Sequence, residues 1–183
     1  IGSVSKAFTV LLTNILTNNF PDINLNDPLY KFNTNFTINN PWGVAMEEKL
    51  GHTITLKHLI SQISGLFRQS PCDGLSCVNY TTSDILAALK NLYLIHPTSI
   101  QGSYSNLAYA LVGNILSEYL AGNFCSNLYQ NLIKPMGMKF TGCYLDNLAN
   151  QSYTAAVPYS QDHKQYPNYE DLGWEMPAGG LFS

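Results

Sequence analysis

The chain has 183 residues, of which 45% are hydrophobic and only 11% are charged. This length is enough for one domain with a real core, and the composition is that of a globular protein, not a disordered one. The net charge of −3 comes without any run of lysine or arginine, which argues against binding to nucleic acid or to an anionic membrane surface. No apolar stretch approaches the ~18 residues that a membrane span needs.

The hydrophobic pattern predicts a helix-rich chain. Apolar residues recur at helical spacing over 4–16, so a first helix should have Ser3 in its first turn and run to about Asn18. Proline-containing breaks follow, and residues 29–53 are expected to be mostly loop.

Four more helical segments are expected further along the chain. Thr55 can cap a short helix over 56–63, with Gly65 as its C-terminal stop. Thr82 or Ser83 can cap the next. The apolar face of this helix consists of Ile85, Leu86, Leu89 and Leu92. Two later helices are expected, one over Leu107–Tyr119 and one over Leu128–Ile133, which Pro135 ends. Only Tyr153–Val157 looks strand-like.

Three N-glycosylation sequons favour a protein of the secretory pathway. Their acceptors are Asn35, Asn79 and Asn150. The chain shows neither a starting methionine nor a signal segment, so we expect a piece of a longer secreted, extracellular or luminal protein.

The four cysteines support the same compartment. Cys72 and Cys77 bracket a short loop that a disulfide can close. Cys125 and Cys143 are candidates for a second bridge. The alternative is four free, buried thiols, whereas zinc is disfavoured because neither pair has a partner pair at ligand spacing.

A serine and a lysine stand three residues apart at the start of the first predicted helix. Ser3 and Lys6 form an S-x-x-K pattern, and positions i and i+3 share one helix face. The helix N-terminus favours an oxyanion there, and a partly desolvated lysine can help to activate a hydroxyl. The alternative is a helix cap with a solvated lysine.

Tyr104-Ser105-Asn106 supplies a second candidate pattern, Y-x-N. A tyrosine near a lysine ammonium can have its pKa lowered enough to act as a base, and Asn106 can hold a substrate amide. Two other stretches share the pattern, 129–131 within a predicted helix and 166–168 within a proline-containing loop. Only Tyr104 lies at a loop-to-helix junction.

Five blocks of the chain extend these patterns. Residues 1–9 are similar to G-S-x-S-K-x-F/L-T and residues 54–66 to I-T-x-x-x-L-L-x-H-T-S-G-L. Residues 104–113 are similar to Y-S-N-x-G-Y-x-L-L-G, 134–141 to P-L-G-M-x-x-T and 178–183 to A-G-G-L-x-S. In this order and spacing the chain resembles the penicillin-recognising serine hydrolases, the family of class C β-lactamases, DD-peptidases and related esterases.

The resemblance implies an α/β (α+β) fold in which a helical domain packs against an antiparallel sheet with flanking helices. Residues 1–183 would be a single, partial domain, mostly the helical domain and the nucleophile helix, without the flanking strands. We expect the chain on its own to be inactive and poorly soluble, because helix faces meant for the sheet stay exposed.

The resemblance also implies a mechanism. Tyr104, assisted by Lys6, takes the proton of Ser3, which attacks a carbonyl to form an acyl-enzyme. The Ser3 amide forms half of an oxyanion hole, and Asn106 binds the substrate. The expected partner is a small-molecule or peptide acyl substrate with an amide, ester or β-lactam carbonyl, and neither metal nor organic cofactor is implied. The alternative is a catalytically inactive secreted relative with a structural or binding role.

Some features depart from the family pattern. Gln62-Ile63 stands where His-Thr is usual, in a segment that supports the fold more than the chemistry, and Ala108 replaces a glycine. The third family motif, Lys/His-Thr/Ser-Gly, is absent up to Ser183. Residues 139–142 imitate it but belong to the turn after Pro135.

The histidines are not expected to be catalytic. His58 should be structural, because it sits among the leucines of a short helix. His52, His96 and His163 lie in predicted loops without a carboxylate or cysteine at ligand spacing. The tyrosine-rich stretch 153–169 fits packing better than it fits a substrate cleft.

Overall fold

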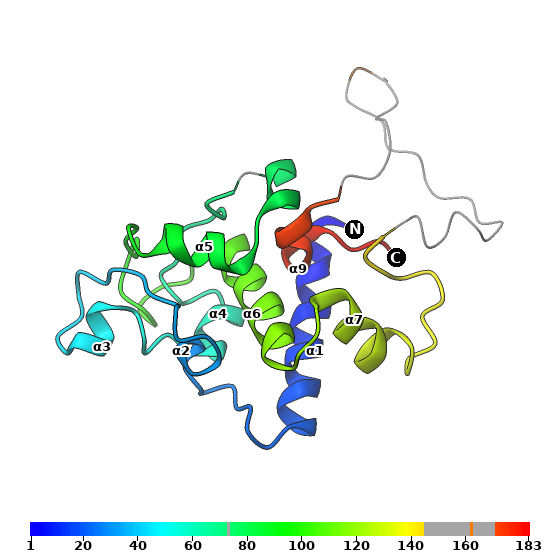
Figure 1. Ribbon diagram of the computed structural model, residues 1–183, viewed down its shortest axis with the longest axis horizontal. Coiled ribbons are helices and arrows are strands. Elements are labelled where there is room, and N and C mark those ends of the chain that lie inside the picture. Colours follow the sequence, from blue (N-terminus) through cyan, green and yellow to red (C-terminus); the bar gives the residue numbers. More distant parts are fainter. Residues whose placement is uncertain (73, 145–161, 163–170) are drawn as a thin grey trace.

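The computed structural model describes residues 1–72, 74–144, 162 and 171–183, and in them short and long helices are joined by loops (Figure 1). The helical elements in chain order are η1 (Gly2–Val4), α1 (Ser5–Asn19), α2 (Leu29–Phe32), α3 (Met46–Lys49), α4 (Leu56–Ile60), η2 (Gly74–Asn79), α5 (Thr82–Leu89), α6 (Asn106–Tyr119), α7 (Phe124–Leu128), η3 (Tyr129–Ile133), η4 (Gly173–Glu175) and α9 (Met176–Gly179).

The described residues contain no strand. Their β-pairing is limited to isolated bridges, which join Pro28 to Thr55, Asn39 to Tyr93 and Gly142 to Phe182. The expected α/β (α+β) architecture is therefore present only in its helical part. The strand-like stretch expected at 153–157 lies outside the described residues.

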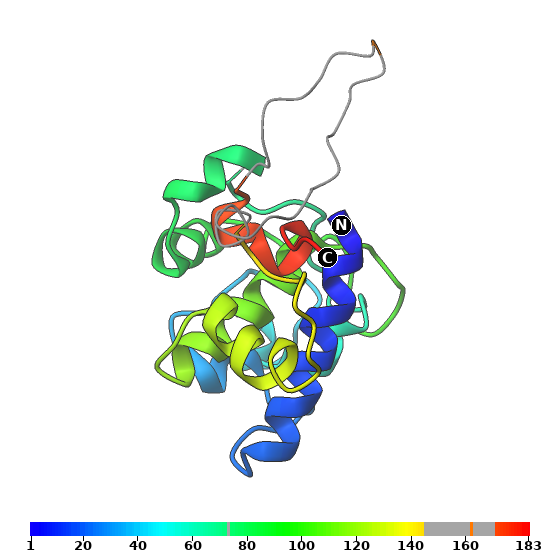
Figure 2. The ribbon, with the colours of Figure 1, turned by 90° about the vertical axis from the view of Figure 1, so that its right-hand side faces the viewer.

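Helix α6 forms the centre of this helical part. From Leu107 to Val112 every side chain is buried, because apolar residues occupy all sides of the segment and not one stripe alone. Helices α1, α4, α7 and α9 pack around it, as Figures 1 and 2 show. Since Tyr104 precedes α6 by two positions, this buried helix anchors the phenol to the core.

Helix α9 lies against α6 at a point where no side chain fits between them. A Cβ added to Gly113 would lie 2.5 Å from Cβ and 2.6 Å from Cγ of Pro177, and 3.0 Å from a ring carbon of Phe124. Only glycine permits this approach. The contact matters for the site because α9 carries Ala178, whose carbonyl holds Lys6.

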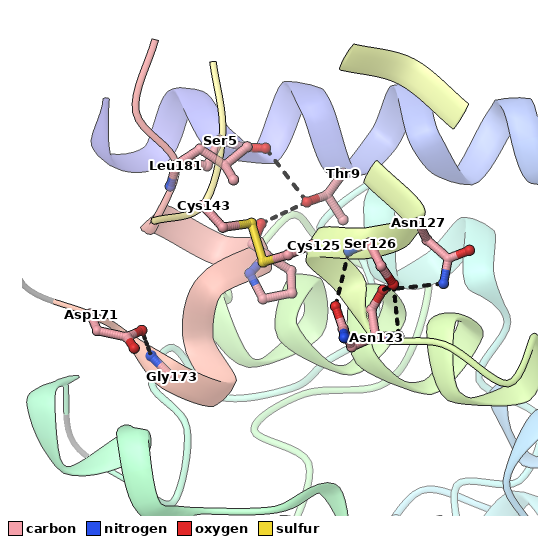
Figure 3. The surroundings of a disulfide bond; sticks show 11 residues. Ser5, Thr9, Asn123, Cys125, Ser126, Asn127, Cys143, Asp171, Gly173 and Leu181 are labelled. Atoms are coloured by element: carbon pink, nitrogen blue, oxygen red, sulfur yellow. Dashed lines mark hydrogen bonds between the residues drawn. A yellow bond between two sulfur atoms is a disulfide. The ribbon is translucent and has the colours of Figure 1, made fainter. Parts of the chain in front are cut away.

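The N-terminal half of α1 turns a polar side chain, not an apolar one, toward α9. Thr9 Oγ1 donates to the carbonyl of Pro177 at 2.7 Å, and Ser5 Oγ accepts from the amide of Leu181 at 3.1 Å (Figure 3). These bonds satisfy backbone groups that a four-residue helix leaves unpaired. The amino group of Ile1 also donates to the Leu181 carbonyl at 2.7 Å, so the two ends of the chain lie side by side (Figures 1 and 2).

Several element boundaries differ from the sequence predictions. The first helix begins as the 3₁₀ turn η1, which holds Ser3, and continues as α1. Within 29–53, α2 and α3 form single helical turns where loop was expected. The cap of α5 is Thr81, not Thr82 or Ser83, because Thr81 and Asp84 hydrogen-bond reciprocally.

The end of α4 also differs from its prediction. Helix α4 stops at Ile60, three residues before the expected end, and Gln62 takes a positive φ of 61°. Gly65 follows with a φ of 82°, in a loop where a Cβ would lie 2.3 Å from the carbonyl oxygen of His96. Gly65 therefore allows two loops to approach closely, and it does not end the helix.

Candidate active site

Ser3 lies in η1, directly before α1, and its side chain is exposed. Its Oγ is hydrogen-bonded to the hydroxyl of Tyr104 at 2.5 Å, although 101 positions separate the two residues. Lys6, one turn further along, donates from Nζ to the same Oγ at 3.2 Å. A hydroxyl and an amine from one helical turn therefore meet a phenol that lies 101 positions from the hydroxyl in the sequence.

A second hydrogen bond holds Lys6 in place. Its Nζ donates to the carbonyl of Ala178 at 2.6 Å, and the side chain is buried. The ammonium also lies 4.7 Å from the ring centroid of Tyr104 and 5.6 Å from that of Tyr109, within the range of cation–π attraction. The amine would lose these hydrogen bonds and ring contacts if it moved into solvent.

Tyr104 is partly exposed, with 37% of the residue accessible to solvent. Partial burial opposes ionisation of the phenol. Hydrogen bonds from Lys6 and Ser3 and the charges of Lys6 and Arg68 outweigh burial, and they lower the pKa of Tyr104 from its ordinary value of 10.0. The Arg68 guanidinium carbon lies 4.8 Å from the centroid of the Tyr104 ring. A lower pKa makes the ionised form of the phenol easier to reach, as expected for a tyrosine near a lysine ammonium.

Gln62 holds the chain on both sides of Tyr104. Its backbone carbonyl accepts from the amide of Ser103 at 2.7 Å, and its side-chain Oε1 accepts from the amide of Ser105 at 2.7 Å. Its Nε2 donates weakly to the Ser105 carbonyl at 3.5 Å. The departure Gln62-Ile63 was expected to concern the fold more than the chemistry, yet Gln62 touches the segment that carries the phenol.

Asn106 begins α6 beside the phenol. Its Nδ2 donates to Oε1 of Gln69 at 2.7 Å, and its backbone amide donates to the Arg68 carbonyl at 2.7 Å. The side-chain carbonyl of Asn106 makes no hydrogen bond within the described residues and can accept one from a substrate amide.

The alternative Y-x-N stretches do not join this site. Tyr129 starts η3 and is half exposed to solvent, and the phenol bonded to Ser3 is that of Tyr104. Residues 166–168 lie outside the described residues. The segment 139–142 is part of the turn that follows η3, where Gly142 pairs with Phe182.

The described histidines make structural contacts. His58 accepts from the amide of Thr55 through Nδ1 at 3.2 Å and completes the cap of α4; burial and the charge of Lys57 lower the pKa of His58. His52 stacks on the ring of Tyr30, and His96 is buried. His163 and the stretch 153–169, apart from residue 162, are outside the described residues.

Both predicted disulfides are present. Cys72 is bonded to Cys77, close in sequence to Arg68 and the candidate site, and Cys125 on α7 is bonded to Cys143 (Figure 3). No cysteine is free, so the alternative of four thiols is wrong.

Two of the three predicted glycosylation acceptors, Asn35 and Asn79, are exposed, whereas Asn150 lies outside the described residues. Within the part of the chain that the structure describes, no helix combines the length and the apolar character needed to cross a bilayer.

The sequence profile of the beta-lactamase family matches residues 1–183, the whole of the chain. The chain belongs to the beta-lactamase family. It is 33% identical to the human protein named "Putative beta-lactamase-like 1" over 184 residues, which cover 100% of this chain and 36% of the human protein. It is 31% identical to Beta-lactamase-like protein 4 of Dictyostelium discoideum over 192 residues, 100% of this chain and 33% of that one.

Solved structures of beta-lactamase relatives share the fold. The beta-lactamase/D-alanine carboxypeptidase of Pseudomonas syringae superposes with a TM-score of 0.75 at 18% identity, over 99% of this chain and 46% of that one. The chain spans about a third of the length of the human and Dictyostelium relatives named above. Family membership agrees with the motifs that led to the site.

Two features of the site were not found from the sequence. Gln62 appeared only as a departure from the family pattern, and its hydrogen bonds to the Tyr104 segment depend on a loop that the pattern does not specify. Arg68 carried no motif at all. Its one signal was that it is the only arginine among the 183 residues.

Proposed function

We propose that the protein is a serine hydrolase that transfers an acyl group from an amide, ester or β-lactam carbonyl to water through an acyl-enzyme on Ser3. The observation that carries this proposal is the three-way arrangement of Ser3, Tyr104 and Lys6, with Oγ 2.5 Å from the phenol and 3.2 Å from the amine. A nucleophile within hydrogen-bond reach of a base that a third group orients is the arrangement that covalent catalysis requires.

In the acylation step, Tyr104 accepts the proton of the Ser3 hydroxyl while Oγ forms a bond to the substrate carbonyl carbon. The positive charge of Lys6, fixed by the Ala178 carbonyl, stabilises the ionised phenol and favours this transfer. The backbone amide of Ser3 donates to the carbonyl oxygen as it gains negative charge. Collapse of the tetrahedral intermediate breaks the bond to the leaving group, which receives the proton from Tyr104.

In the deacylation step, Tyr104 accepts a proton from water, and the water oxygen bonds to the acyl carbon. The bond between that carbon and Ser3 Oγ then breaks, and Oγ recovers its proton from the phenol. The acid product leaves, and the starting hydrogen bonds re-form. Asn106 holds the substrate during both steps through its amide group.

Labelling of Ser3 tests the proposal. A fluorescent penicillin or a fluorescent fluorophosphonate, applied to the full-length protein, should attach to the wild type and fail to attach to Ser3→Ala. Ser83→Ala, which removes an exposed serine on α5, is the matched control and should label like the wild type. No label on the wild type, or equal label on Ser3→Ala, would defeat the proposal.

The second candidate is a secreted relative that keeps the scaffold for binding or assembly. The two disulfides suit an oxidising compartment, and we propose a secreted, extracellular or luminal location on that ground together with the sequons. This candidate predicts a chain that is glycosylated and disulfide-bonded yet inert toward both labels. The intact Ser3–Tyr104–Lys6 arrangement favours the enzyme.

A further inference from the structure

Glu175 is a buried acid that the acyl-transfer mechanism does not use. Only 7% of the residue is exposed, and it takes part in no ion pair within the described residues, where the pair found joins Lys31 to Asp27. Its Oε1 accepts from the backbone amide of Ser70 at 3.3 Å. Because the withdrawal of a carboxylate from water costs free energy, a buried acid with this partner indicates a task for that hydrogen bond.

Element η4, which ends at Glu175, is fixed to three neighbouring elements. The Trp174 carbonyl accepts from Nδ2 of Asn114 in α6 at 2.7 Å, and the Trp174 indole Nε1 donates to the Thr82 hydroxyl in α5 at 3.0 Å. A Cβ added to Gly173 would lie 2.3 Å from the backbone of η2, so η4 also packs directly on η2. The core therefore determines where the backbone of Glu175 lies.

Residues 67–70 lie against the start of α6. The carbonyl of the first of them accepts from Oγ of Ser105, and the carbonyl of the second accepts from the amide of Asn106, both at 2.7 Å. Oε1 of Gln69 accepts from Nδ2 of Asn106, also at 2.7 Å. The orientation of the Asn106 side chain, and with it the direction in which its carbonyl can accept from a substrate amide, thus depends on the place of Gln69.

Glu175 joins this segment to the element that holds Lys6. Ser70, from whose amide Glu175 accepts, follows Gln69 directly. Ala178, whose carbonyl accepts from Nζ of Lys6, lies three positions after Glu175 on α9. The Ser70 hydroxyl is buried and makes no hydrogen bond within the described residues, so the connection runs through the backbone amide.

We propose that Glu175 is a positioning residue, which holds residues 67–70 through the Ser70 amide in the place from which Gln69 orients Asn106. The proposal rests on the acyl transfer proposed above and concerns substrates that carry an amide beside the scissile carbonyl. An ionised acceptor bonds an amide N–H more strongly than a neutral one does, so a carboxylate suits this task.

Two neutral 4-nitrophenyl esters test the proposal on the full-length protein. The ester of N-acetylglycine carries an amide N–H beside the scissile carbonyl, and the ester of pentanoic acid has a chain of the same length without an amide. The quantity measured is the ratio of kcat/KM for the N-acetylglycine ester to that for the pentanoic ester. Because both esters are measured on one preparation, a change in the fraction of folded enzyme cancels from this ratio.

Glu175→Met removes the acceptor while it keeps a side chain of similar size, and it should lower the ratio about 5-fold. Glu175→Gln, which keeps a neutral acceptor, should retain most of the wild-type ratio. Two controls should keep all of it. Ser70→Ala removes the unbonded hydroxyl but not the amide. Glu48→Met removes a carboxylate that accepts two backbone amides at the start of α3, which Figure 1 shows well apart from α9.

An Asn106→Ala background tests whether Glu175 acts through Asn106. Asn106→Ala alone should lower the ratio at least as far as Glu175→Met does. In the double variant the ratio should fall no further, because two changes that remove one interaction are not additive. A merely structural role of Glu175 would not produce this dependence.

The failures of the two proposals are distinguishable. A wild-type ratio in Glu175→Met or in Asn106→Ala, a ratio in Glu175→Gln as low as that in Glu175→Met, or a further fall in the double variant would overturn the positioning role and leave Ser3-dependent hydrolysis standing. A Glu175→Met protein that does not fold would make Glu175 a residue of the core alone. Absence of any hydrolysis that Ser3→Ala removes would overturn acyl transfer itself and, with it, the inference about Glu175.

Discussion

Tyr104 receives its character from its neighbours, because a phenol with an ordinary pKa is a poor acceptor for a serine proton. Hydrogen bonds from Lys6 and Ser3 and two nearby charges oppose the effect of burial and lower the pKa of Tyr104. Tyr104→Phe removes the hydroxyl and keeps the ring over which Lys6 and Arg68 lie. We expect kcat/KM for a neutral ester to fall about 10²- to 10⁴-fold, with an unchanged melting temperature. Equal activity in the variant would remove Tyr104 from the reaction.

The pH dependence follows from the same pKa. The ionised phenol accepts the Ser3 proton, so kcat/KM should rise as pH increases through the pKa of Tyr104 and reach a plateau above it. Arg68→Gln removes one positive charge that favours the phenolate. The pKa of Tyr104 then rises, and the midpoint of the rise in kcat/KM should move to higher pH. A pH series with a neutral ester measures this, and a midpoint that stays or moves lower contradicts the assignment.

Gln62 is expected to act through the segment that carries Tyr104. Gln62→Ala removes the bond to the Ser105 amide and leaves that amide without its partner, which should lower kcat/KM about 10-fold. Gln62→His, the residue usual in the family pattern, should recover part of the loss. Gln101→Ala, a change of an exposed glutamine in the loop before Tyr104, is the control. A Gln62→Ala enzyme with wild-type kcat/KM and a lowered melting temperature would reduce Gln62 to a purely structural role.

The candidate catalytic residues were named from the sequence and remain predictions, whereas the groups that hold them in place were not named. Two short patterns, in the order and spacing usual in the family, indicated Ser3, Lys6, Tyr104 and Asn106. The Ala178 carbonyl that holds Lys6 and the hydrogen bonds of Gln62 join positions far apart in the chain. Such contacts depend on how loops pack, and no local pattern encodes them.

Among the elements, α9 links the core to the site, because it packs on α6 at Gly113 and holds Lys6 through Ala178. Gly113→Ala would place a Cβ 2.5 Å from Pro177, and a proline ring has no flexible end to yield. A glycine-to-alanine change inside a helix usually adds about 1 kcal/mol of stability, but here overpacking should reverse the sign and cost about 1–3 kcal/mol.

Urea unfolding of Gly113→Ala and the wild type measures this difference. Gly102→Ala serves as the control, because nothing lies within 4 Å of the added Cβ, and its stability should match the wild type. Lower activity is also expected in Gly113→Ala, since displacement of α9 moves the Ala178 carbonyl away from Lys6. A Gly113→Ala protein as stable as the wild type would show that α9 shifts at no cost.

The long helices were predicted well, and of the short ones α4 was predicted with its cap Thr55 whereas α2 and α3 were not. Helices α1, α5 and α6 each carry an apolar repeat that extends over two or more turns, and their first residues agree with the predictions to within about two residues. Helix α5 ends at Leu89, before the Leu92 that was expected on its apolar face. Helices α2 and α3 span four residues each, too few for any periodicity to show. Their existence depends on tertiary packing, because an isolated turn is not stable in water.

For the molecule as a whole, the family resemblance indicated more than the hydrophobic pattern alone. The hydrophobic pattern predicted helices but not how they are arranged. The order of the motifs predicted an arrangement, and the family profile and the fold of solved relatives agree with it. The sheet part of the expected α/β (α+β) fold does not occur in the described residues. The apolar side chains of Val4 in η1 and Leu11 in α1 are exposed.

The attachment point of the acyl group tests the central claim most directly. The full-length protein is incubated with a slowly released acyl donor such as benzylpenicillin, quenched in acid, digested and sequenced by tandem mass spectrometry. The account predicts one added acyl mass, located on Ser3, present in the wild type and strongly reduced in Tyr104→Phe. An adduct located on any other residue, or equal acylation of Ser3 in Tyr104→Phe, would contradict it.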